Sequence, residues 1–151
     1  MYLSRLKAYK NDHGLSNISI LSHDVITYDY PEHYYDVVNC ILVGCCMRKS
    51  EFENMILSIK RTIKNNGLII MSLRNYLDPE FLEYSLTEKP IEPNTYVKKD
   101  ACCKIRYYIE NNRLRDLFVN FEILYYFEGL SPDKYQEVEY HGDSYIICKK
   151  V

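Results

Sequence analysis

The chain has 151 residues, of which 47% are hydrophobic and 26% are charged, and its formal net charge is -2. This composition is typical of a globular protein with a single core. Proteins that neutralise phosphates normally carry a basic surplus, so no binding to nucleic acid is expected. The longest apolar run, residues 37–47, is shorter than the roughly 20 residues that cross a bilayer, so no membrane segment is expected.

The cysteine pattern indicates reduced thiols. The six cysteines form two adjacent pairs and two single residues: Cys45-Cys46, Cys102-Cys103, Cys40 and Cys148. Adjacent cysteines rarely form a disulfide with each other, and no signal peptide is recognisable before Lys7, so a cytoplasmic location is expected. The two pairs could together offer four thiolates to a metal, but zinc-binding pairs are normally separated by two residues, so no metal is expected.

The first 24 residues predict a helix and then a short strand. Residues 2–12 have the spacing of an amphipathic helix, and Gly14 is placed to end it in a left-handed conformation. In 17–21 apolar and polar residues alternate, which predicts a strand leading into Asp24.

The centre of the chain predicts a strand–helix–strand unit. Residues 37–43 are nearly all apolar, which is typical of a parallel strand covered on both faces. Ser50 and Glu53 resemble a capping box at the start of a helix, whose apolar residues recur at helical spacing up to residue 63. Asn66-Gly67 ends that helix, and 68–72 predict the next buried strand.

The second half of the chain begins with an irregular excursion over residues 73–96, which contains three prolines. The patterns that follow predict, in order, a strand at 105–109, a short helix at 114–118, a strand at 121–127, a turn at 141–143 and a last strand at 144–149. His141 is a candidate for a catalytic base, but a solvent-exposed turn histidine is the favoured interpretation.

The order of these motifs resembles a known family. Asp24-Val25 follow a strand, 35–38 open the next strand, 64–70 end the helix and open another, and 121–126 with 145–150 form a closing pair. This order resembles the second half of a class I S-adenosylmethionine-dependent methyltransferase, similar to the small-molecule group of tellurite-resistance and thiopurine methyltransferases.

The resemblance implies an α/β fold with an incomplete Rossmann-like methyltransferase sheet. Its parallel strands would be followed by a C-terminal antiparallel hairpin, and the N-terminal two strands of the family would be missing. It implies a single methyltransferase-like domain over residues 1–151, in which 73–109 form an excursion that covers the substrate. The implied reaction is methyl transfer from S-adenosylmethionine to a small molecule.

The resemblance also implies roles for four residues. Asp24 would accept a hydrogen bond from the adenine amino group of the cofactor, and the backbone of Val25 would contact the ring. Asn39 and Cys40, at the carboxyl end of a strand, would lie beside the methionine part. The alternatives are that Asp24 is a turn or cap residue and that Asn39 and Cys40 are ordinary strand packing. No catalytic residue is assigned, because methyl transfer proceeds chiefly through proximity and orientation.

One departure from the family leaves two interpretations open. The family's glycine-rich cofactor loop and the acid that binds the ribose have no counterpart here, since the five glycines, at 14, 44, 67, 129 and 142, are isolated. The chain is therefore either an impaired methyltransferase or, alternatively, a non-catalytic remnant or a subunit that pairs with another chain. A partner chain or a dimer would cover the open sheet edges, unless the strand at 17–21 moves in beside 37–43.

Overall fold

The computed structural model describes residues 2–98, 103–132 and 140–151. The described elements, in chain order, are α1 (Tyr2–Asp12), β1 (Tyr35–Ile41), the 3-10 helix η1 (Gly44–Cys46), α2 (Lys49–Thr62), β2 (Ile63–Arg74), α3 (Pro79–Thr87), β3 (Thr95–Val97), β4 (Ile105–Tyr107), α4 (Arg113–Leu117), β5 (Phe121–Pro132) and β6 (Tyr140–Lys150).

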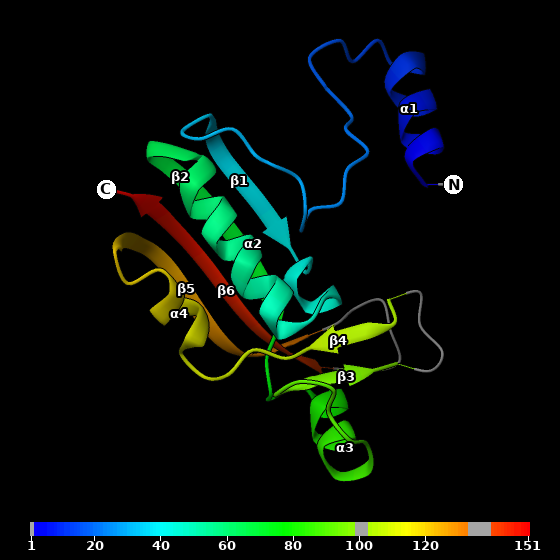
Figure 1. The fold of residues 1–151 in the computed structure, drawn as a ribbon, viewed down its shortest axis with the longest axis vertical. Helices are drawn as coiled ribbons and strands as arrows, with labels where there is room; N and C mark the ends of the chain where they lie inside the picture. The colour runs from blue at the N-terminus through cyan, green and yellow to red at the C-terminus, as the bar shows by residue number, and fades with distance from the viewer. Residues whose placement is uncertain (1, 99–102, 133–139) are drawn as a thin grey trace.

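Four strands form the main sheet, in the order β1-β2-β6-β5 (Figure 1). β1 and β2 are parallel, with Val37 opposite Leu68 and Ile41 opposite Ser72. β6 is antiparallel to both of its neighbours. The predicted parallel pair and the closing antiparallel hairpin are therefore confirmed.

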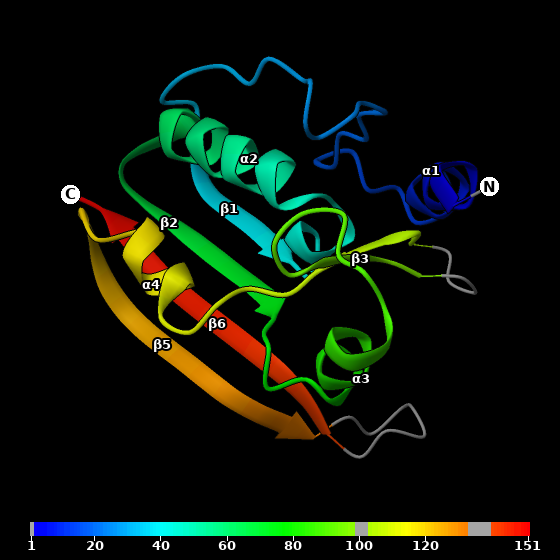
Figure 2. The same cartoon turned by 60° about the horizontal axis from the view of Figure 1, so that its bottom comes forward.

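One face of this sheet is covered by α2 and α4 (Figures 1 and 2). The α2 residues that pack against it recur at helical spacing, and all are buried: Phe52, Met55, Ile56 and Ile59. They join Ile69 and Met71 of β2 and Ile146 of β6 in one core cluster. Each such side chain contributes roughly 1.5–3 kcal/mol when it is fully buried, so this face holds the sheet and the crossover helix together.

β1 is an edge strand, and one of its faces is exposed. The prediction of a strand covered on both faces is therefore wrong. Val38 and Cys40 pack into the core cluster, whereas Val37 is 51% exposed and Ile41 is 44% exposed. Among the described residues β2 is the only strand that pairs with β1. The outer edge of β1 therefore presents unpaired backbone groups beside apolar side chains.

The N-terminal segment contains the predicted helix but not the predicted strand. Gly14 follows α1 with φ of +62°, as expected of a left-handed cap. Residues 17–21 form turn and coil, and Ile18 and Leu21 are exposed. Alternation alone does not make a strand where no neighbouring strand offers hydrogen bonds. Since 17–21 do not pair with β1, the segment leaves the edge of the sheet open.

The excursion after β2 is more regular than the sequence predicts. It contains α3 and the β3–β4 hairpin, both of which lie near the carboxyl ends of β1 and β2 (Figures 1 and 2). Asp78 caps α3, since its Oδ1 accepts a hydrogen bond from the Glu80 N–H at 2.9 Å.

Two further boundaries differ from the predictions. The turn predicted at 141–143 lies inside β6, where Gly142 and Asp143 pair with Leu130 and Gly129 of β5. α2 begins at Lys49, and the Arg48 N–H donates to Glu51 Oε2 at 2.7 Å, so the capping acid is Glu51 and not Glu53.

Candidate functional site

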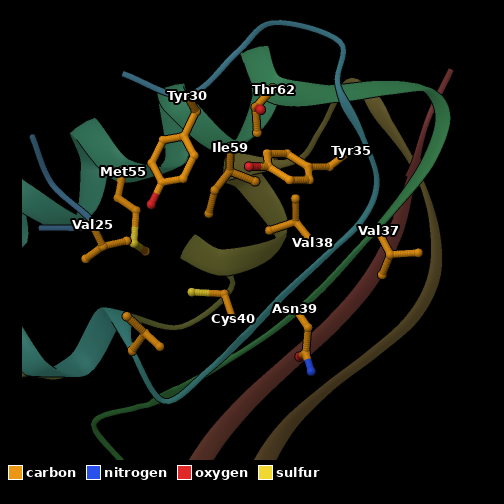
Figure 3. Close-up of a pocket in the computed structure, with 11 residues that line it drawn as sticks. Val25, Tyr30, Tyr35, Val37, Val38, Asn39, Cys40, Met55, Ile59 and Thr62 are labelled. Atoms are coloured by element: carbon orange, nitrogen blue, oxygen red, sulfur yellow. The ribbon is translucent and has the colours of Figure 1, made fainter. Parts of the chain in front are cut away.

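An apolar pocket of about 280 Å³ lies along the free edge of β1, between that strand, α2 and the segment that precedes β1 (Figure 3). This edge pocket is lined by Val25, Tyr30, Tyr35, Val37, Val38, Asn39, Cys40, Val43, Met55, Ile59 and Thr62. Its volume is just below the roughly 300–1,000 Å³ that is typical of small-molecule sites. The pocket is therefore large enough for part of a nucleoside ligand and offers mainly apolar contacts.

Hydrogen bonds to the end of α2 hold the segment over this pocket. Thr62 Oγ1 donates to the Pro31 carbonyl at 2.5 Å, and the Tyr34 N–H donates to the Thr62 carbonyl at 2.7 Å. Arg61 pairs with the exposed Asp29 at 2.9 Å, which adds little because water screens such a pair. These bonds fix the position from which the Tyr30 ring points into the pocket (Figure 3).

Three of the four residues expected to bind a cofactor line the edge pocket: Val25, Asn39 and Cys40. Val38 and Cys40 point to the α2 side of β1, and Val37 and Asn39 point to the other side (Figure 3). The pocket receives side chains from both faces because it wraps around the open edge of the strand. Burial, and then the charge of Cys45, raise the pKa of Cys40 to about 11, so its thiol stays neutral at ordinary pH.

Asp24, the fourth expected residue, is exposed and lies next to the edge pocket through its neighbour Val25. Its Oδ1 accepts a hydrogen bond from the Ile26 N–H at 2.9 Å, and its carbonyl accepts one from the Tyr28 N–H at 3.0 Å. Asp24 is therefore a turn residue in this structure, as the alternative interpretation states. A carboxylate has capacity for further donors, so this role leaves acceptor sites on the side chain.

A second pocket, of about 290 Å³, lies at the carboxyl end of β2 and is strongly charged. This end pocket is lined by Arg74, Asp78, Pro79, Glu80, Glu83, Lys98, Arg106 and His141. Burial opposes ionisation of Glu80, but bonds from Lys98 and Tyr108 and the nearby Arg106 outweigh it and lower the pKa of Glu80. The end pocket therefore combines fixed charges of both signs.

A buried carboxylate organises one wall of the end pocket. Asp78 is 1% exposed, and its Oδ2 lies 3.1 Å from His141 Nδ1 and accepts a bond from the Gly142 N–H at 3.2 Å. Beside it, Arg74 Nη1 lies 2.6 Å from Asp143 Oδ1. His141 is thus a strand residue held by a carboxylate, and the prediction of an exposed turn histidine is wrong.

No local pattern in the sequence indicates this wall. Asp78 and His141 are 63 residues apart, and only the folding of the excursion against β6 brings them together. The Asp78-Pro79 step is recognisable as a helix start, which identifies the cap of α3 but not its histidine partner.

The structure adds two findings on metals and membranes, within the residues it describes. In residues 2–98, 103–132 and 140–151 no three histidine, cysteine or acidic side chains are grouped so that they could hold a metal ion. Cys102, part of the four-thiolate alternative, lies outside those residues. No helix in the same part of the chain has the length and hydrophobicity needed to span a membrane.

No protein-family model matches the sequence, and no curated protein matches it significantly. Solved structures do share its fold. TehB from Haemophilus influenzae aligns with 99% of the chain at a TM-score of 0.70 and 15% identity. A 1,6-didemethyltoxoflavin N1-methyltransferase from Burkholderia thailandensis, solved with S-adenosylhomocysteine, aligns with 97% of the chain at a TM-score of 0.65 and 10% identity. The [4+2]-cyclase SpnF aligns with 98% of the chain at a TM-score of 0.62 and 13% identity.

The chain spans 46% of TehB, 56% of the toxoflavin enzyme and 62% of SpnF, so it corresponds to about half of these proteins. At such identities the comparison establishes architecture. The order β1-β2-β6-β5 and the agreement over nearly the whole chain confirm the resemblance inferred from the sequence. The chain therefore has the Rossmann-like α/β fold of S-adenosylmethionine-dependent methyltransferases.

Proposed function

We propose that this protein binds S-adenosylmethionine beside β1 and belongs to an enzyme that transfers the methyl group to a small molecule. The observation that supports this most is the sheet, whose parallel β1–β2 pair and antiparallel β6 match methyltransferases over nearly the whole chain. In open α/β sheets, ligands bind beyond the carboxyl ends of the strands. Asn39 and Cys40 lie near the carboxyl end of β1.

The edge pocket suits the adenine part of this cofactor. Adenine is flat and largely apolar, and Val25, Tyr30 and Ile59 offer an apolar wall of matching character. The exocyclic amine needs an acceptor, which Asp24 supplies at the rim. No residue matches the family's ribose-binding acid, so the affinity of the isolated chain is expected to be low.

The end pocket suits the methyl acceptor. An acceptor oxygen or nitrogen that carries a proton must lose it as the new bond to the methyl group forms, and His141, oriented by Asp78, is able to take that proton. The charges of Arg74 and Glu80 would orient a polar substrate. When bound, S-adenosylmethionine supplies the electrophilic methyl group. Most residues that line the end pocket belong to the excursion over 73–109, which supports a substrate-covering role for that segment.

Calorimetric titration of the whole chain with S-adenosylmethionine tests the proposal. Asp24→Ala is expected to weaken binding by roughly 1–3 kcal/mol, because the adenine amine loses its acceptor. Asp29→Ala is the matched control: Asp29 lies in the same segment, is exposed and pairs only weakly with Arg61, so the affinity should not change. Absence of any heat contradicts cofactor binding, whereas equal affinities of the wild type and the Asp24 variant show that Asp24 is not the adenine acceptor.

A non-catalytic subunit is the second candidate, because the edge of β1 is open. Val37 and Ile41 are exposed there, and a strand from another polypeptide would pair with the free backbone groups. SpnF, a [4+2]-cyclase with this fold, illustrates that the fold alone does not fix the reaction. Light scattering discriminates the candidates: a dimer that Val37→Lys dissociates supports edge pairing, and a monomer in both forms contradicts pairing between copies.

The thiols support a reducing compartment such as the cytoplasm. The described cysteines are all free, and they include the buried Cys40 and Cys148 as well as the exposed Cys46. Proteins of oxidising compartments normally convert such residues to disulfides.

A further inference from the structure

The face of the main sheet opposite α2 and α4 is apolar, and no described helix lies on it (Figures 1 and 2). The strand register brings six large apolar side chains of β2, β6 and β5 together on this face: Leu68, Ile70, Tyr145, Ile147, Tyr125 and Phe127. These six residues are called the open face below. Sheets with parallel strands are normally covered on both faces, so the open face lacks a layer that such sheets usually have.

The side chains of the open face point away from the core. Ile69 belongs to the core cluster under α2, and its neighbour Ile70 points to the other side of the sheet because side chains alternate along a strand. Ile70 pairs with Ile147, which pairs with Tyr125, so one apolar row crosses three strands. Tyr125 is 52% exposed. A continuous apolar surface of this kind marks an interaction site.

The helix α1 is a second apolar element without a cover. Leu3, Leu6 and Tyr9 recur at helical spacing, and each is between 41% and 55% exposed. Both views place α1 apart from the sheet (Figures 1 and 2). Isolated helices shorter than about 12–15 residues are only marginally stable in water, and α1 has 11 residues. α1 therefore needs a surface to pack against.

The open face matches α1 in size and in charge. The apolar stripe from Leu3 to Tyr9 is about 9 Å long. Along β2 the open face extends about 13 Å, from Leu68 to Ser72, the residue opposite Tyr145. α1 contains three basic residues and one acidic residue, a formal charge of +2. Since the whole chain has a formal charge of -2, the rest of it carries -4, which favours the approach of α1.

The attachment of α1 directs it to another molecule. The segment between α1 and β1 is fixed on the α2 side of the sheet, where Val25 and Ile26 pack against the core cluster and the Pro31 carbonyl accepts the bond from Thr62. To reach the open face of its own chain, α1 would have to cross the free edge of β1. In the structure it projects away from the sheet instead (Figure 1). Residues 13–24 reach about 40 Å when extended, which spans the distance to a neighbouring molecule.

We propose that two copies of this chain exchange their α1 helices, and that each α1 packs Leu3, Leu6 and Tyr9 on the open face of the other copy. The exchange is reciprocal about a twofold axis, so each dimer makes the contact twice. It removes two apolar surfaces per chain from water, which is the driving force for association.

The exchange would also fix the segment that forms one wall of the edge pocket. Val25 and Tyr30, which line that pocket, lie between α1 and β1 together with Asp24. A docked α1 holds this segment at both of its ends. S-adenosylmethionine is therefore expected to bind more weakly to a monomeric variant than to the dimer. This consequence rests on the proposed function, whereas the exchange itself does not.

Analytical ultracentrifugation of the whole chain without ligand tests the dimer. The mass of the wild type is expected near twice the 18.0 kDa of one chain. Leu6→Glu places a charge against the open face and should weaken the dimer at least about tenfold. Ala8→Glu is the matched control, because Ala8 is exposed on the opposite side of α1 and the added charge is the same. A monomeric wild type, or equal effects of the two substitutions, overturns the proposal.

Two variants of the sheet side locate the surface that receives α1. Tyr125→Glu adds a charge to the open face and should weaken the dimer as Leu6→Glu does. Val119→Glu, at an exposed apolar position that follows α4, should not weaken it. Circular dichroism checks that the variants are folded. A dimer that Val37→Lys dissociates and Leu6→Glu leaves intact is paired through the edge of β1, and this result overturns the exchange.

Isotope-filtered NMR tests whether α1 contacts the other copy. Dimers are prepared from a mixture of chains labelled with carbon-13 and unlabelled chains. Nuclear Overhauser effects between the methyl groups of Leu6 in one copy and Ile70 or Ile147 in the other are expected. The same effects seen only within one copy would show that α1 folds back on its own sheet, which overturns the proposal.

Discussion

Gly142 in β6 touches the loop that carries Asp78 more closely than any side chain would allow. A Cβ atom at this position would lie 2.1 Å from the Asp78 backbone N and 2.4 Å from Asn75 Oδ1. The backbone of the loop cannot rotate away as a side chain can. The contact between β6 and the loop, and hence the Asp78–His141 pair of the end pocket, depends on glycine at this position.

Gly142→Ala is therefore expected to destabilise the protein by about 3 kcal/mol, the upper range for overpacking in a core. Urea denaturation measures the change. Gly129→Ala is the matched control in the neighbouring strand, because its Cβ would meet only the end of the Phe127 ring, at 3.1 Å, which is able to move. Equal effects of the two substitutions would contradict the close approach described for Gly142.

Some residues of the pockets are predictable from the sequence, and others are not. Val25, Asn39 and Cys40 were predicted from a motif order, and the fold brings them to one pocket. Arg106 was not predicted, since its contact with Cys45 joins residues 61 positions apart. Motifs identify positions next to a strand end, but contacts from the excursion depend on its tertiary path.

At the scale of elements, the start of α2 allows a direct comparison of prediction and structure. The sequence favoured Ser50 with Glu53 as the capping pair, yet Glu51 accepts the bond from the Arg48 N–H at 2.7 Å. The Ser50 hydroxyl instead donates to Glu92 at 3.0 Å. A pattern of residue types leaves the register open by one or two positions, and the approach of Glu92 decides it here.

Glu51→Ala is expected to cost about 1 kcal/mol of stability, because an N–H at the helix start loses its acceptor and the helix dipole loses a favourable charge. Thermal unfolding of this variant and of Ser50→Ala measures both contributions. The Ser50 variant should lose less than about 0.5 kcal/mol, as is usual for an exposed site. The reverse ranking would favour the capping pair predicted from the sequence.

The elements that were predicted well are those whose pattern matches their packing. α2 shows apolar residues at helical spacing and buries them, and β2 is an apolar run between two neighbouring strands. Residues 17–21 show strand alternation without a partner, and they remain coil. β6 extends through the predicted turn because β5 supplies partners as far as Pro132. Whether a segment becomes a strand here depends on a neighbouring strand to pair with, which a single sequence does not reveal.

At the scale of the whole molecule, the main sheet has one covered face and two edge strands, β1 and β5. α2 and α4 cover the same face, and β1 lies at the edge beside the edge pocket (Figures 1 and 2). The two pockets lie at neighbouring strands, the edge pocket along β1 and the end pocket beyond β2. This arrangement would place a cofactor and an acceptor side by side, as direct methyl transfer requires.

Amide chemical shifts, measured while the protein is titrated with S-adenosylhomocysteine, test whether the cofactor binds beside β1. The largest shifts are expected at Asp24, Val25, Asn39 and Cys40, with little change at the far strand β5. The absence of shifts at saturating ligand, or shifts centred on β5, would contradict it.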